Sequence, residues 1–464
     1  MRPPFFDTGI STGLRLLIVG LSYFLLAAWL KYKVAPRPLG ITRAIAALPI
    51  FVANIFCPWL FNDADELMHR LSTAFVLSWL CNFKVLAFCW GRPPLRDSMT
   101  VLQLAAVIML PLFPKPPDSH LARSPKKGRL HDSAGSGAVL AWRWVAKIAL
   151  LGSMAYMLLK YGDLMPGVVR HYVYAFGLYS FVGVLMDGPA ALAVEALGLQ
   201  LIPTFDQPWL SSSLADFWGR RWNIPTASLL RTVVYDPVID GSLVPRAHHA
   251  LHHSTFAPPP PPPPPPAKQP EQDPSGYRHD LSPSSPREEM PSPPQQQQAH
   301  HRNGYITKPQ QRHHHHDHHD HHQHHHHHHP NQQQRVSELR RQLGLHATFL
   351  VSGVVHEYIA WLVKANDDWG WKWTVFFWIQ APLLTLESLA GRAMRRAGLQ
   401  LPRPVAIVLT LVVLELLAYD LFFGFVEKDT DLASRVVAAV SSGYNIVQSP
   451  LRPVFASLAA GLRL

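Results

Sequence analysis

HATFLVSGVVHEYIAWLV, residues 346–363, is an almost uninterrupted apolar stretch that carries a histidine and a glutamate side by side. Because a hydrocarbon core of about 30 Å needs a helix of about 17–25 mostly apolar residues, this stretch is long enough to lie within a bilayer. An ionisable residue in a membrane segment is costly and is by default a functional hypothesis. His356 and Glu357 are therefore the first candidates for a functional site.

Apolar runs of similar length occur through most of the chain, which has 464 residues, 48% of them hydrophobic. They lie at 14–30, 41–61, 71–90, 99–113, 138–160, 168–186, 372–390 and 404–426, with weaker ones at 188–203 and 434–458. The sequence predicts an all-α fold, a polytopic transmembrane bundle of about 8–11 helices. The first run lacks a small-residue cleavage site, so we expect it to remain as an anchor, with the endoplasmic reticulum membrane as the default location.

Two hydrophobic blocks, residues 1–244 and 336–464, flank a segment of very different composition at 245–335. The proline run 258–266 favours an extended polyproline II conformation, and the histidine tract 313–329 favours solvated coil. We expect one long disordered loop here, because the segment cannot bury enough apolar surface to fold. Without fixed geometry the histidines would bind divalent ions only loosely, so no specific metal site is predicted. A metal-buffering or regulatory loop is the alternative.

The formal net charge is +11, and Lys and Arg lie mainly in short loops between the apolar runs, at 31–43, 91–96, 123–129 and 391–403. This placement is typical of charges that face the cytoplasm and anionic lipid headgroups. It argues against a nucleic-acid partner. Basic loops on both sides of the run 99–113 leave its topology open: either the run is re-entrant or one span is misassigned.

The surroundings of His356 favour chemistry over a purely structural role. Ser352 lies four residues earlier on the same helical face, and the small residues at 352–353 allow another backbone or a ligand to approach. Imidazole, with an ordinary pKa of about 6.5, is the side chain best suited to remove a proton near neutral pH. The structural alternative is a neutral histidine that is hydrogen-bonded to a neighbouring helix.

A second cluster, SLADFWGRRWN at 213–223, combines charge with aromatic rings. On a helix, Asp216 and Arg220 are four residues apart, as are Trp218 and Trp222, which predicts an ion-pair face beside an aromatic face. Such a segment is expected at the headgroup level. It is either an interfacial anchor or a site at which Arg220 and Arg221 bind the phosphates of a nucleotide-bearing substrate.

These segments, together with VVYDP at 233–237 and LSWLCNFKVLAFCWGRPPL at 77–95, resemble the plant-type wax synthases, a branch of the membrane-bound O-acyltransferases. SGVVHEY at 352–358 is similar to the S-x-x-x-H-E-Y motif of the broader family, and RWN at 221–223 is similar to a motif that ends in Trp-Asn. The resemblance implies the fold of that family, with transfer of a fatty acyl group from acyl-CoA to a long-chain alcohol. The chain departs from the family pattern through the insertion at about 247–334.

The resemblance also implies roles for individual residues. His356 is expected to be the general base, Asn223 to position or polarise the thioester, and Glu357 to tie the histidine helix to the bundle or to bind a water. The predicted substrate-binding residues are Asp216, Trp218, Arg220, Arg221, Trp222 and Ser352. No cofactor is expected, because acyl-CoA is a co-substrate with an activated thioester.

The acceptor is left open, since similar motifs serve a fatty alcohol, a sterol or diacylglycerol. The non-enzyme alternatives are a polytopic transporter and an inactive scaffold. The remaining intramembrane charges, Lys84, Arg143, Lys147 and Glu415 with Tyr419, are expected either to pair between helices or to line the substrate chamber.

Overall fold

A computed structural model of the protein describes residues 10–62, 66–115, 134–245, 337–363 and 370–448. All of them belong to one compact unit that contains both hydrophobic blocks. The expected loop from residue 246 onward, its histidine tract and the basic segment 123–129 lie outside the described residues.

The first block contains helical segments as far as residue 240. They are α1 (Thr12–Trp29), η1 (Leu30–Val34), α2 (Ile41–Ala46), α3 (Leu48–Phe56), η2 (Cys57–Leu60), α4 (Leu67–Thr73), η3 (Ala74–Cys81), α5 (Asn82–Cys89), α6 (Val101–Met109), α7 (Gly137–Tyr161), η5 (Gly162–Leu164), α8 (Gly167–Leu197), η6 (Pro208–Leu210), α9 (Leu214–Asp216), η7 (Phe217–Arg221), α10 (Ile224–Leu230), η8 (Arg231–Tyr235) and α11 (Asp236–Asp240).

The second block is also helical. It contains α13 (Glu338–Val363), α14 (Lys372–Trp378), α15 (Gln380–Arg396), α16 (Arg403–Ala418), η9 (Tyr419–Asp429) and α17 (Leu432–Gln448). The described residues contain no strand, only an isolated bridge between Pro114 and Leu201. The predicted all-α fold is confirmed.

Five helical stretches of the described residues are long and apolar enough to cross a membrane: Thr12–Val34, Leu67–Cys89, Gly137–Leu164, Gly167–Leu197 and Arg403–Asp429. They confirm a polytopic membrane protein, although they are fewer than the spans expected from apolar runs alone. The helix that carries His356, α13, is not among these five stretches. The run 41–61 is divided into α2, α3 and η2, with a proline near the start of both α3 and η2. The run 188–203 is no separate span, because α8 extends through it to Leu197.

The run 99–113 forms only the nine-residue helix α6. At about 1.5 Å per residue this helix rises about 14 Å, roughly half of a hydrocarbon core. The buried ammonium of Lys84 donates to the carbonyls of Val107 and Leu110, both at 2.8 Å, and so satisfies the end of the helix. The helix formed by the run 99–113 is therefore too short to cross the membrane. Of the two roles expected for Lys84, contact between helices and lining of the substrate chamber, the geometry favours the first.

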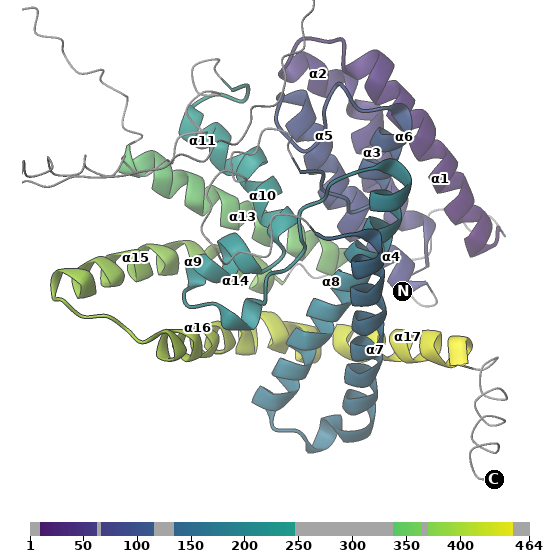
Figure 1. Ribbon diagram of the computed structural model, residues 1–464. Helices are drawn as coiled ribbons and strands as arrows, with labels where there is room; N and C mark the ends of the chain where they lie inside the picture. The colour runs from purple at the N-terminus through teal and green to yellow at the C-terminus, as the bar shows by residue number, and fades with distance from the viewer. Residues whose placement is uncertain (1–9, 63–65, 116–133, 246–336, 364–369, 449–464) are drawn as a thin grey trace, which may run out of the picture. The chain divides into compact units, whose positions relative to one another are not determined.

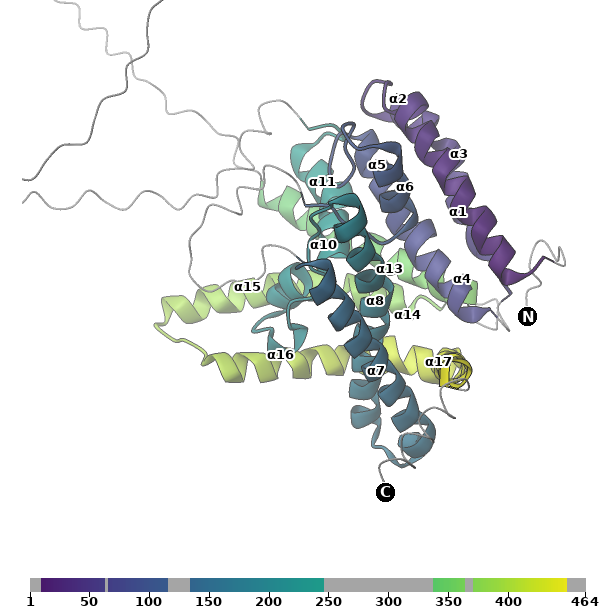
Figure 2. The same cartoon turned by 45° about the vertical axis from the view of Figure 1, so that its right-hand side comes forward.

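Helices α7 and α8 form an antiparallel hairpin beside which α17 runs (Figures 1 and 2). Lys147 on α7 pairs with Asp187 on α8 at 2.5 Å, and Gly183 leaves the room that the lysine needs. Glu195 accepts a hydrogen bond from the backbone N–H of Gly137 at 2.8 Å, which ties the end of α8 to the start of α7. The hairpin is thus fixed by one buried ion pair and one partly buried hydrogen bond, and it forms one wall of the site described next.

Candidate active site

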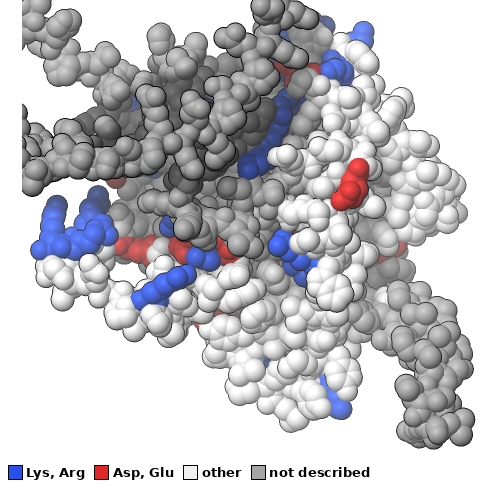
Figure 3. All heavy atoms as spheres, in the orientation of Figure 1, with Lys and Arg blue, Asp and Glu red and all other residues white. Residues whose placement is uncertain are grey.

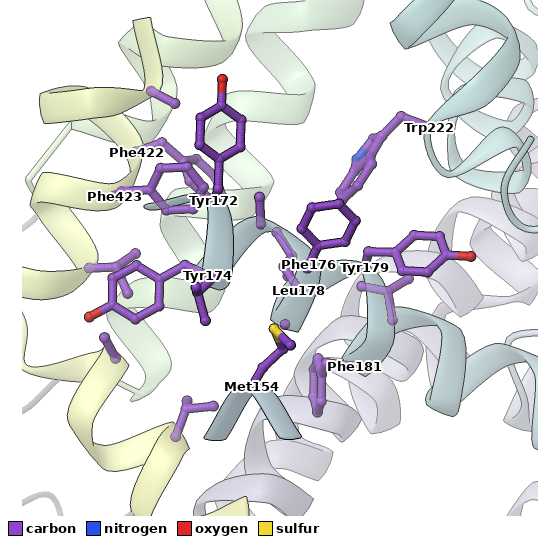
Figure 4. Close-up of a pocket in the computed structure, with 18 of the residues that line it drawn as sticks. Met154, Tyr172, Tyr174, Phe176, Leu178, Tyr179, Phe181, Trp222, Phe422 and Phe423 are labelled. Atoms are coloured by element: carbon purple, nitrogen blue, oxygen red, sulfur yellow. The ribbon is translucent and has the colours of Figure 1, made fainter. Parts of the chain in front are cut away.

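A cavity of about 470 Å³ lies among the helices, a size common for small-molecule sites. Its wall is mostly apolar and comes chiefly from α7, α8, the segment 208–223, α13, α14, α16, η9 and α17. Figure 4 shows aromatic side chains on both sides of it, with Phe422, Phe423 and Tyr174 opposite Trp222, Tyr179 and Phe181. Apart from Tyr and Trp, the polar side chains among its described lining residues are those of His356, Asn223 and Glu415.

The imidazole of His356 is held with a defined tautomer. Its Nδ1 lies 2.7 Å from the backbone carbonyl oxygen of Ser352, one helical turn earlier. Because a carbonyl only accepts hydrogen bonds, Nδ1 carries the proton, and the neutral ring presents an unprotonated Nε2. The ring stacks on Phe377 at 4.0 Å and meets the edge of Trp79 at 4.7 Å. Packing and one hydrogen bond thus fix the ring at the cavity wall.

Glu357 faces away from this ring and caps α14. Its Oε2 accepts hydrogen bonds from the backbone N–H groups of Trp373 and Thr374, at 3.0 and 3.2 Å, and the residue is only 1% exposed. A carboxylate at a helix N-terminus satisfies orphan donors and complements the helix dipole. Of the two roles expected for Glu357, the geometry favours the tie between helices, because α14 supplies the Phe377 ring against which His356 stacks.

Gly353 explains how α14 comes so close to the histidine helix. A Cβ placed on Gly353 would lie 2.7 Å from the Cα of Thr374 and 2.8 Å from its carbonyl oxygen. The backbones of α13 and α14 therefore approach each other at this glycine, as the small residues at 352–353 predicted.

Asn223 is brought to the same cavity by a different part of the chain. It has a left-handed backbone, with φ of 42°, and precedes α10. Asparagine tolerates this conformation better than most residues do. Backbone bonds hold it on both sides: Asp206 N–H donates to Arg221 O at 3.0 Å, and Ile224 N–H donates to Thr204 O at 2.9 Å.

The Asn223 side chain has hydrogen-bonding capacity to spare. The residue is 9% exposed and lines the cavity, and its Oδ1 is buried without a hydrogen-bond partner in the described part of the chain. A buried polar atom without a partner is costly, so native proteins rarely keep one without a reason. The structure thus brings His356 and Asn223, 133 positions apart in the printed numbering, to one cavity.

The two neighbouring arginines have different environments. Asp216 accepts from Arg221 Nε at 2.7 Å and pairs with Arg220 Nε at 3.2 Å. The Arg221 side chain is 16% exposed and also donates to the carbonyl of Asp206 at 3.0 Å, whereas the Arg220 side chain is 63% exposed. Asp216 orients Arg220 as expected, but only Arg220 is accessible enough to meet a phosphate. Arg221 is a structural tie.

The prediction of an aromatic face on the segment 213–223 is wrong. The helix widens into the π-helical turn η7 and ends at Arg221, so that Trp222 is extended and the four-residue spacing no longer aligns two rings. Trp222 stacks on Phe217 at 5.6 Å, while Trp218 lies against Phe377 at 5.7 Å. Both tryptophans nevertheless line the cavity.

Two residues of α15 that the sequence did not single out hold this segment in place. Glu387 accepts from the backbone N–H groups of Leu214 and Ala215, at 2.7 and 3.1 Å. Gln380 is fully buried and accepts from the indole Nε1–H of Trp218 at 3.1 Å. A glutamate and a glutamine inside the apolar run 372–390 were the available signal, since polar groups there need partners.

The end of α15 exposes a basic patch, defined here by Arg392, Arg395, Arg396 and Arg403. Figure 3 shows Lys and Arg side chains gathered where α15 turns toward α16. Exposed charge at this turn fits the expected contact with anionic headgroups. Across the described ranges, no group of three or more His, Cys, Asp or Glu residues is arranged to hold a metal ion.

The fold and the site define a class: an all-helical polytopic membrane protein with a histidine at the wall of an internal apolar cavity. No protein-family model matches the chain. The chain is similar to acyl-CoA-sterol O-acyltransferase 1 of Arabidopsis thaliana, with 33% identity over 224 residues, which are 48% of this chain and 60% of that protein. It is also similar to the long-chain-alcohol O-fatty-acyltransferase of Simmondsia chinensis, with 30% identity over 212 residues, 44% of this chain and 56% of that protein.

These similarities confirm the resemblance that the motifs indicated. Further Arabidopsis thaliana relatives, named as probable long-chain-alcohol O-fatty-acyltransferases, match at 28–30% identity. The matches span 60% and 56% of the length of the first two relatives. The activities in these names belong to the relatives, and for this chain they are a proposal.

Proposed function

We propose that this protein is a membrane-bound O-acyltransferase of the endoplasmic reticulum that transfers a fatty acyl group from acyl-CoA to a long-chain fatty alcohol, forming a wax ester. The observation that carries the proposal is the geometry of His356. Its Nδ1–H is bonded to the carbonyl of Ser352, and Nε2 remains available at the wall of an apolar cavity. A general base requires such an unprotonated nitrogen, available to the reacting hydroxyl.

In the proposed reaction the alcohol oxygen attacks the carbonyl carbon of the thioester, and its proton passes to Nε2 of His356. The C–O bond forms and the C–S bond breaks, after which Nε2 returns the proton to the departing thiolate of CoA. The products are the ester and free CoA thiol. The Ser352 carbonyl stabilises the ring while it carries two protons, because it continues to accept from Nδ1–H.

Asn223 is proposed to bind the thioester. Its amide can donate from Nδ2 to the thioester carbonyl and stabilise the negative charge that develops there, and the unpartnered Oδ1 can accept from a substrate N–H. Arg220, oriented by Asp216, is proposed to bind a CoA phosphate from its exposed position. The apolar wall holds the acyl chain and limits water, the competing nucleophile.

A sterol is the second candidate acceptor. The relative with 33% identity is named as a sterol acyltransferase, whereas the Simmondsia chinensis relative with 30% identity is named for long-chain alcohols. Both acceptors present a single hydroxyl on an apolar body, so the chemistry proposed for His356 is the same for each. Diacylglycerol is the third candidate.

The proposal is tested in microsomes from a host that lacks its own neutral-lipid acyltransferases. Labelled palmitoyl-CoA is supplied with hexadecanol, a sterol or diacylglycerol, and the parent is compared with His356→Ala and His346→Ala. His346 lies on the same helix but does not line the cavity, so it is a matched control.

We expect the parent and His346→Ala to form ester and His356→Ala to form none at equal abundance. The acceptor that is consumed identifies the product. Ester formation by His356→Ala at the parental rate would remove His356 as the base, and no ester from any acceptor would favour a non-catalytic scaffold or a transporter.

A further inference from the structure

Glu415 is the only carboxylate among the described residues that line the cavity. It lies on α16, within the most apolar of the five candidate spans, Arg403–Asp429. A carboxylate at this depth is costly and indicates either a buried pair or a bound ligand. Its printed polar contact is a buried pair with His171.

One oxygen of Glu415 belongs to a buried polar cluster, which we define as Arg170, His171, Glu415 and Glu427. Glu415 Oε1 lies 3.1 Å from Nδ1 of His171, and the other ring nitrogen of His171 lies 3.6 Å from Glu427 Oε2. Arg170 pairs with Glu427 Oε1 at 2.6 Å. His171 itself is 3% exposed and packs against the rings of Tyr419 and Phe423.

The donors of this cluster reach one oxygen of each carboxylate. His171 Nδ1 faces Glu415 Oε1 at 3.1 Å, and Arg170 donates to Glu427 Oε1 at 2.6 Å. Glu427 Oε2 is buried without a hydrogen-bond partner among the described residues.

The second oxygen of Glu415 makes no hydrogen bond to any residue of the described ranges. Its side chain is 11% exposed, and the residue lines the cavity. A carboxylate oxygen in apolar surroundings needs a donor. A thioester or ester carbonyl cannot supply one, because it only accepts, whereas a hydroxyl group can.

We propose that Glu415 forms a second polar subsite of the cavity, which accepts a hydrogen bond from the hydroxyl group of a neutral lipid alcohol. The subsite is separate from His356. Several aromatic rings lie between His356 and His171. One path of ring contacts passes through Phe377, Phe422 and Phe423, with centroid separations of 4.0 to 6.3 Å.

The subsite gives the proposed acceptor a place to bind before its hydroxyl reaches His356. The identification of the ligand as the acyl acceptor rests on the proposed function. The recognition of a hydroxyl donor rests only on the geometry of Glu415. An alcohol would bind here, while its methyl ether, which has the same oxygen without the donor, would not be recognised.

The test uses the full chain in detergent micelles, in a His356→Ala background so that no ester forms and no hydroxyl is recognised at that histidine. A photoactivatable hexadecanol probe labels the protein, and unlabelled hexadecanol or hexadecyl methyl ether competes for it. Glu415→Leu and Glu415→Gln are compared with Thr410→Val, which is on the same helix but does not line the cavity. Melting temperatures confirm folding.

We expect hexadecanol to compete about tenfold or more better than the ether, because a hydrogen bond to a charged group is involved. Thr410→Val should keep this ratio, Glu415→Leu should reduce it to about one, and Glu415→Gln should retain part of it because its neutral amide oxygen accepts more weakly. Should Glu415→Leu fail to fold, the partial loss in Glu415→Gln decides the question.

Equal competition by alcohol and ether, or an unchanged ratio in both Glu415 variants, would overturn the subsite. The outcome is independent of turnover. If the parent chain formed no ester but discriminated alcohol from ether, the proposed function would be contradicted and the subsite would still be supported.

Discussion

Two histidines, His356 at the cavity wall and His171 behind the lining residue Glu415, differ in what faces their ring nitrogens. His356 has a backbone carbonyl at one nitrogen and the cavity at the other, whereas His171 has a carboxylate near each. The first arrangement leaves a lone pair on Nε2, and the second places both ring nitrogens against carboxylates. Two residues of one type thus have different surroundings, which support the proposed proton transfer at His356 and a structural pairing at His171.

The largest expected effect comes from truncating each histidine in turn. His356→Ala should lower kcat by about 10²–10⁴-fold with little change in melting temperature, because it removes a base. His171→Ala should instead cost about 1–3 kcal/mol of stability, because Glu415 Oε1 loses its partner while Glu427 keeps Arg170. Steady-state kinetics and thermal unfolding of both variants test the contrast. A large loss of stability in His356→Ala would contradict it.

Glu357 sharpens the comparison, because it supports the His356 site without touching the ring. Glu357→Ala leaves the N–H groups of Trp373 and Thr374 without a partner and should cost about 1–3 kcal/mol, with reduced turnover. Glu357→Gln keeps an acceptor oxygen and should recover most of both. If Gln were as damaging to turnover as Ala at normal stability, the carboxylate would have a role in proton transfer.

Gly353 tests the close contact behind the His356 site. Gly353→Ala should destabilise the protein by about 1–3 kcal/mol, because the new methyl group would meet the backbone of Thr374. Gly443→Ala on α17 is the matched control, since a Cβ there meets nothing within 4 Å. Thermal unfolding should separate the two, and equal melting temperatures would show that the helices do not approach as described.

The smallest effects concern the two arginines. Arg220→Ala should raise KM for acyl-CoA by about five- to tenfold without changing stability, because an exposed guanidinium loses a phosphate contact. Arg221→Ala should lower the melting temperature and affect KM less, because its side chain ties Asp216 to the backbone of Asp206. A larger KM effect in Arg221→Ala and a larger stability loss in Arg220→Ala would contradict this assignment.

Much of this organisation could be predicted from the sequence, and the failures have local causes. Apolar length identified the membrane helices but overestimated their number, since prolines lie where 41–61 divides into short helices and α6 ends at Met109, shortly before Pro111. The motif residues His356 and Asn223 were identified, and both line the cavity. The aromatic face predicted for 213–223 was wrong because the spacing argument assumes an α-helix, and the chain forms a π-helical turn there.

The sequence by itself determined the all-helical membrane class and the residues whose side chains could take part in a reaction, because hydrophobic length and residue type are properties of the chain. Only the tertiary structure decided which groups these residues contact. It assigned the Nδ1 proton of His356, directed Glu357 to a helix end, separated Arg220 from Arg221 and placed Glu415 at the cavity. Each of these depends on which distant group is the hydrogen-bond partner, and no spacing along the chain contains that information.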